Sequence, residues 1–107
     1  MNMHDDLASK YDSVFELLSN FNAAEPIPIG MLGKVYSTLD TMRSRRAPSQ
    51  DIATIEQISV AIRRLEMARR NRDDATERSL GERLELLVSD WLEMHPPGFE
   101  QMAEAAE

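Results

Sequence analysis

The sequence contains no cysteine. This absence excludes disulfide bonds, thiolate catalysis and zinc sites built from cysteine. Aromatic residues are scarce, at 6% of the 107 residues, so the core must consist mainly of leucine, isoleucine, valine and methionine. No apolar run approaches the roughly 20 residues that a membrane-spanning helix needs. The N-terminal stretch has neither the basic nor the apolar region of a secretory signal. We therefore expect a cytoplasmic protein without a membrane segment.

The sequence also lacks the residue patterns of enzyme chemistry. Neither His4 nor His95 has a second ligand at the helical spacing of a zinc site. The segment Gly30–Val35 lacks the glycine spacing and the preceding strand of a phosphate-binding loop. Asp73 and Asp74 lie in a solvated turn, which does not separate the pKa values of a catalytic pair. We therefore predict no catalytic residue, no metal site, no cofactor and no enzymatic activity.

The apolar spacing predicts an all-α fold, with a small bundle of about four helices forming one domain over residues 1–107. Helical periodicity covers residues 4–21, 29–45, 50–70 and 74–94. Pro26, Pro28 and Pro48 interrupt it, because proline cannot continue a helix. Gly30 and Gly33 near the second helix start suggest close helix packing, and Ile29 and Tyr36 are assigned to that helix's apolar face. The tail after about residue 99 is expected to fray.

A long antiparallel hairpin at residues 49–95 organises the chain. Each half carries one apolar seam with alternating spacings of three and four: Ile55, Ile58, Ile62 and Leu65 in the first half, and Leu80, Leu84, Leu87, Trp91 and Met94 in the second. The charged residues 71–74 form the turn, with Asp73 or Asp74 capping the last helix. Asp74 and Glu77 have the capping-box spacing. Because neither glycine nor proline marks this turn, one long bent helix is the alternative.

Apolar residues outside the seams indicate further contacts. Ala53, Val60 and Met67 are seven residues apart and lie on the far side of their helix from the main seam. Gly81, inside the last helix, suggests a close contact there. Surplus apolar surface on a small chain favours self-association, a protein partner, or both. The residues predicted to contact a partner or a second subunit are Tyr11, Phe15, Val60, Met67 and Leu86.

Charge is distributed unevenly along the chain. Residues 43–72 contain eight basic and three acidic residues, a net charge of +5, whereas residues 73–107 contain two basic and ten acidic residues, a net charge of −8. Mutual attraction of the two neighbouring helices is the first interpretation of this difference. A basic patch for nucleic acid is the alternative, which the formal net charge of −7 for the whole chain disfavours.

Two stretches resemble a known family: HDDLASKYDSVFELLSNF at residues 4–21 and SVAIRRLEMARRNRDD at residues 59–74. Together with the length, the lack of cysteine and the acidic balance, they make the chain similar to the QslA-type quorum-sensing antiactivators of Pseudomonas. The resemblance implies a helical homodimer. It also implies binding to the ligand-binding domain of a LuxR-type transcription factor, which blocks dimerisation of that factor and hence its binding to DNA. The resemblance extends over the whole chain and rests on no short motif, so no binding residue carries over.

Three hypotheses therefore stand side by side. The chain is an antiactivator that sequesters a transcription factor, a structural subunit whose apolar rows serve a homo-oligomer, or a nucleic-acid-binding protein that uses the arginines of residues 43–72.

Overall fold

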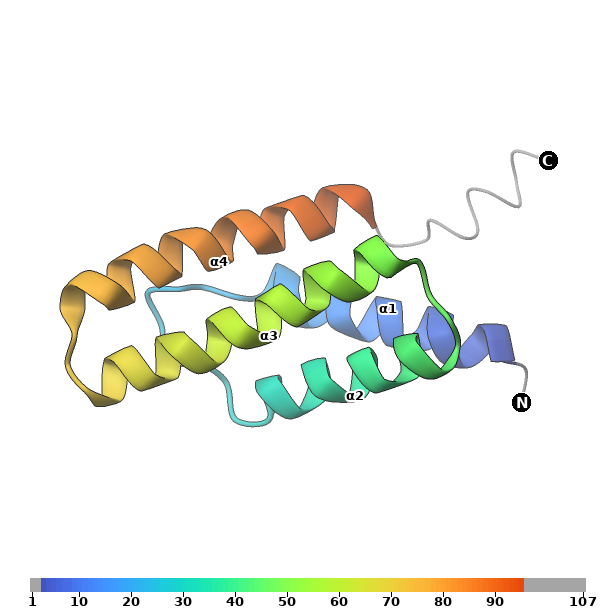
Figure 1. Cartoon of the computed structure of the whole chain (residues 1–107), viewed down its shortest axis with the longest axis horizontal. Helices are drawn as coiled ribbons and strands as arrows, with labels where there is room; N and C mark the ends of the chain where they lie inside the picture. Colours follow the sequence, from blue (N-terminus) through green and yellow to red (C-terminus); the bar gives the residue numbers. More distant parts are fainter. Residues whose placement is uncertain (1–2, 96–107) are drawn as a thin grey trace.

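The structure, a computed structural model, describes residues 3–95, and it describes the exposure of side chains from residue 7 onward. It confirms the all-α bundle. Four helices, α1 (Met3–Ser19), α2 (Met31–Ser44), α3 (Ser49–Arg70) and α4 (Asp74–Met94), run alternately up and down (Figure 1). α1 packs against α2 and α4, and α3 packs against α2 and α4. The predicted tail after residue 99 lies outside the described residues.

The core is formed by the predicted seams, with one shift on α4. All four predicted α3 residues (Ile55, Ile58, Ile62 and Leu65) are fully buried. On α4 the buried residues are Gly81, Leu84, Val88 and Trp91. Met94 is 41% exposed, so its place in the seam was wrong. The buried face is rotated because α4 packs against both α3 and α1, whereas the predicted seam considered only α3.

The start of α2 also differs from the prediction. Ile29 is fully exposed and precedes the helix, Tyr36 is 41% exposed, and Met31 occupies the core instead. Gly30 is the N-cap residue with φ of 83°, a left-handed conformation that glycine adopts without strain. A side chain at Gly33 would meet no atom within 4 Å. The two glycines therefore do not serve close helix packing: Gly30 serves the turn, and Gly33 meets no neighbour.

α2 and α3 end in the same way, and the second of these ends forms the hairpin turn. Arg46 and Arg72 have φ of 55° and 57°, in the left-handed region. The amide of Asp73 donates to the carbonyl of Ala68, and the amide of Arg72 donates to that of Arg69, which is the Schellman pattern. This position usually holds glycine, but here it holds arginine, so no glycine marks the turn in the sequence. Two separate helices are confirmed, and a single bent helix is excluded.

Asp73 begins α4 as its N-cap. Its carboxylate accepts hydrogen bonds from the Thr76 amide at 3.2 Å and the Thr76 hydroxyl at 2.6 Å. These bonds, the side-chain one first, lower the pKa of the Asp73 carboxyl below its ordinary value of 3.8. The cap is therefore Asp73, and the predicted capping box that began at Asp74 was wrong.

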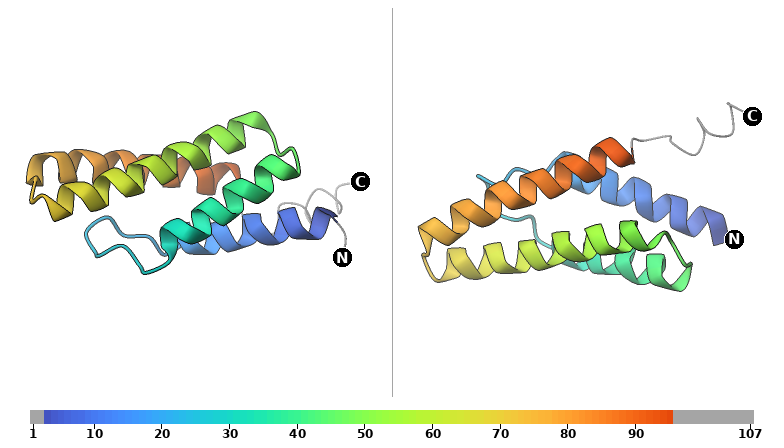
Figure 2. Two further views of the ribbon diagram at one scale, coloured as in Figure 1. Left: turned by 60° about the horizontal axis from the view of Figure 1, so that its bottom comes forward. Right: turned by 45° about the horizontal axis from the view of Figure 1, so that its top comes forward.

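The hairpin of α3 and α4 is longer than the pair formed by α1 and α2. α3 has 22 residues and α2 has 14, so α3 extends about 12 Å further at 1.5 Å per residue. Figure 2 shows the turn end of the hairpin projecting beyond α2, with the connector of residues 20–30 lying along part of it. At Gly81 a Cβ atom would lie 3.4 Å from the Cβ of Ala23. The expected close contact thus comes from the connector, at a distance that an alanine tolerates.

No helix within residues 3–95 is both long and apolar enough to cross a lipid bilayer.

Candidate protein-interaction surface

The outer side of α3 carries the second apolar row predicted from the sequence. Val60 is 45% exposed and Met67 is 57% exposed, and Ala53 is also exposed. The core residues of α3 lie on the opposite side of the helix, so no helix of the described chain covers this row. We call Ala53, Val60 and Met67 the outer row.

A groove runs along the junction of α3 and α4, and all three residues of the outer row line it. Its two sections have volumes of about 570 and 580 Å³. They share Val60, Arg64 and Leu80, so they form one continuous depression. The groove follows α3 from Ala53 to Asn71, about 27 Å at 1.5 Å per residue. Its apolar floor comes from Val60 and Met67 on α3 and from Leu80 on α4.

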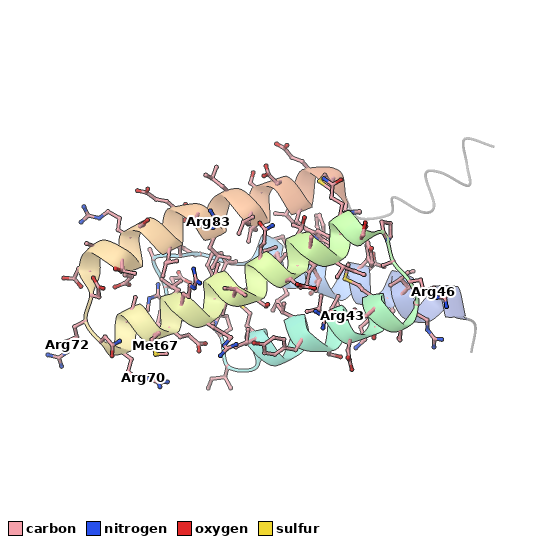
Figure 3. The ribbon with its side chains drawn as sticks, in the orientation of Figure 1. Arg43, Arg46, Met67, Arg70, Arg72 and Arg83 are labelled. Atoms are coloured by element: carbon pink, nitrogen blue, oxygen red, sulfur yellow. The ribbon has the colours of Figure 1, made fainter. Side chains whose placement is uncertain are left out.

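Positive charge borders this groove. The arginines at its edge are Arg63, Arg64 and Arg83, and none of them has an ion-pair partner among residues 3–95. Figure 3 shows Arg83 on α4 next to α3, and Met67 near the C-terminal end of α3.

Two acidic residues also line the groove, and both are engaged. Glu56 binds Arg43 at 2.7 Å, and Asp73 caps α4. The groove is thus lined by three arginines and two acidic residues, and the charge of Glu56 is paired with Arg43, so the lining has a net positive charge.

The structure separates the five predicted contact residues. Val60 and Met67 share the outer row. Leu86 is 67% exposed on α4 and does not line the groove. Phe15 is partly exposed on α1, which packs against α2 and α4. Tyr11 is engaged inside the chain.

A polar cluster at the other end of the hairpin holds Tyr11. Its hydroxyl donates to Asp51 Oδ2 at 2.8 Å, and His95 Nε2 lies 2.9 Å from Asp51 Oδ1. The Tyr11 ring lies 5.5 Å from that of Trp91, which lies 4.2 Å from the His95 ring. Asp51 is 5% exposed. The sequence gives no sign of this cluster, because the partners of Asp51 are 40 and 44 residues away along the chain.

This cluster fastens three helices together. Tyr11 belongs to α1, Asp51 to α3, and His95 caps the end of α4. The indole Nε1 of Trp91 has no hydrogen-bond partner among the described residues, so packing alone holds that ring. We assign the cluster a structural role.

Arg69 fastens the connector to the hairpin. Its guanidinium donates to Glu77 Oε1 at 2.9 Å, to the carbonyl of Glu25 at 2.8 Å and to the carbonyl of Ala23. Part of the basic cluster of α3 is thus structural, as the charge pattern predicted.

The remaining arginines do not form one strip. Figure 3 places Arg46 and Arg72 at opposite ends of the bundle. A nucleic-acid surface needs basic side chains that converge on one backbone, and these two diverge.

Within residues 3–95 no group of three or more histidine, aspartate or glutamate side chains is arranged to hold a metal ion. Comparison with protein-family models, with curated proteins and with solved structures finds no match to this chain.

Proposed function

We propose that this chain is a protein-interaction regulator of the antiactivator kind. It binds the ligand-binding domain of a LuxR-type quorum-sensing transcription factor in the cytoplasm and blocks dimerisation and DNA binding of that factor. It uses no cofactor and no catalytic residue. The observation that carries this proposal is the outer row, where Val60 and Met67 are 45% and 57% exposed on a helix whose other side is fully packed.

An exposed apolar row is better suited to competition for a protein surface than to catalysis. A subunit interface is held by a few buried apolar anchors surrounded by polar residues. A decoy that presents similar anchors competes for that interface without any chemical step. The resemblance of residues 4–21 and 59–74 to the QslA-type antiactivators supplies the regulator as the partner, and it favours a homodimer as the active form.

The test is direct binding to a purified ligand-binding domain of a LuxR-type regulator. We expect a complex in which light scattering finds one regulator subunit, and loss of operator binding by the full regulator. Met67→Glu should weaken the complex and so reduce the loss of operator binding. Ile29→Glu is the matched control, because Ile29 is fully exposed and lies outside the groove. Unchanged regulator dimerisation in the presence of the wild-type chain would refute the proposal.

A structural homo-oligomer subunit is the second candidate. The observation that favours it is the exposed side of α4, where Leu86 lies among the exposed acidic residues Glu82, Glu85 and Asp90. This acidic surface is complementary to the basic groove of another copy. If self-association alone consumes the outer row, Met67→Glu will convert the chain to a monomer, and no regulator will bind the wild type.

A further inference from the structure

We propose that the groove between α3 and α4 binds an acidic amphipathic helix of a partner protein. This inference rests on the proposed function, because it names the chemistry that the same surface recognises. Three observations carry it: the apolar floor, the unpaired arginines at the edge, and the length of the depression.

The floor favours a helix with an apolar seam. Val60 and Met67 lie seven residues apart on α3, about 10 Å along the helix axis, and Leu80 faces them from α4. A partner helix that lies along α3 meets such positions with residues spaced by three, four and seven, as in other helix-in-groove complexes. The groove length of about 27 Å corresponds to a helix of about 18 residues.

The edge selects negative charge. Arg63, Arg64 and Arg83 border the floor without an internal partner. Of the two acidic residues in the lining, Glu56 is paired with Arg43, so the net charge of the lining is positive. The formal net charge of −7 does not prevent this selection. At physiological salt the Debye length is about 8 Å, so the nearby guanidinium groups dominate the field inside the groove. Guanidinium groups also form paired hydrogen bonds with carboxylates.

A separate protein fits the groove better than the α4 helix of a second copy. The acidic side of α4 presents one large apolar residue, Leu86, against three on the floor. The other exposed apolar residue of α4, Met94, lies eight residues further on and about 80° around the helix. Such a dimer would leave part of the floor uncovered. A nucleic acid fits less well, because an apolar floor offers nothing to a phosphate backbone.

The test uses two labelled synthetic helical peptides of about 18 residues. Both carry the same leucine seam, and the residues beside the seam are glutamate in one and lysine in the other. Fluorescence anisotropy with the full chain should detect binding of the glutamate peptide, weakening as salt is raised, and little binding of the lysine peptide. Arg83→Glu should weaken the binding about tenfold, or about 1.4 kcal/mol. Arg78→Glu, on an exposed part of the same helix that does not line the groove, should leave it unchanged.

Several outcomes would overturn the inference. These are equal binding of the two peptides, equal effects of Arg83→Glu and Arg78→Glu, tighter binding of duplex DNA than of the glutamate peptide, or a dimer that Arg83→Glu dissociates and that excludes the peptide. If the regulator domain binds through Met67 but the glutamate peptide does not bind, the proposed function stands and this inference fails. If the glutamate peptide binds but the regulator domain does not, the inference stands and the regulator is the wrong partner.

Discussion

Removal of the Asp51 carboxylate should destabilise the bundle strongly. Asp51→Ala deletes the acceptor of the Tyr11 hydroxyl and of His95 Nε2, at 2.8 and 2.9 Å, in a site where the Asp51 side chain is 8% exposed. A hydrogen bond to a charged group contributes about 1.5–3 kcal/mol. Two such bonds are lost, while the cost of burying the carboxylate is relieved. We therefore expect a loss of about 2–3 kcal/mol of unfolding free energy.

The assay is thermal and urea denaturation followed by circular dichroism and by the fluorescence of Trp91, the single tryptophan. A loss of this size lowers Tm by roughly 10–20 °C in a domain of about 100 residues. Trp91 reports the site directly because its ring lies 4.2 Å from that of His95. Asp40→Ala, which removes an exposed aspartate on α2, is the control, with an expected change below about 0.5 kcal/mol.

A double-mutant cycle with Tyr11→Phe separates the hydrogen bond from general damage. We expect a coupling energy of about 1 kcal/mol between Tyr11 and Asp51. The reasoning is refuted if Asp51→Ala is no more harmful than Asp40→Ala, or if the effects of Tyr11→Phe and Asp51→Ala add without coupling.

Four further substitutions test α2, the hairpin turn and the connector. Gly33→Ala should stabilise the fold by about 0.5–1 kcal/mol in urea denaturation, because alanine has the higher helix propensity and its Cβ meets no neighbour. Arg72→Gly should stabilise the fold by a similar amount, because glycine adopts the left-handed conformation of this position without strain. A loss of stability in either variant would contradict the backbone conformation described at that residue. Arg69→Ala should cost about 1.5–3 kcal/mol and speed amide exchange at residues 23–25, whereas Arg70→Ala should do neither. Asp73→Ala should lower Tm at neutral pH, and the difference from the wild type should shrink as the pH is lowered below 3.8. The reason is that the lowered pKa of Asp73 gives stability that is present above the unfolded pKa and is lost as pH falls through the folded pKa. A difference that stays constant throughout the acid range would exclude this cap.

The helices were predictable because their signals are local. The α3 seam is defined by spacing alone, and all four of its residues are fully buried. The α4 seam was only partly predictable. Val88 is buried and Met94 is exposed, because α1 also packs against this helix. The spacing of apolar residues within one helix does not reveal this second neighbour. The charged residues 71–74 predicted the hairpin turn, but no sequence pattern predicts the left-handed backbone conformation of Arg72.

The candidate site was also only partly predictable from the sequence. The outer row follows from a seven-residue repeat, so Val60 and Met67 could be predicted from the sequence. The groove that this row lines could not be predicted, because it depends on the register of α4 against α3, which brings Leu80 to the floor and Arg83 to the edge. The Tyr11–Asp51–His95 cluster joins residues from three helices, and no spacing rule connects positions so far apart.

The outer row of α3 is the surface that we propose binds a protein partner. Calorimetric titration of the regulator's ligand-binding domain with the wild type, Met67→Glu and Ile29→Glu tests this proposal most directly. A glutamate at residue 67 lies three and four residues after Arg64 and Arg63, where opposite charges stabilise a helix, so the variant should fold. We expect at least about tenfold weaker binding for Met67→Glu and unchanged binding for Ile29→Glu. Equal affinities of all three chains would contradict the proposal.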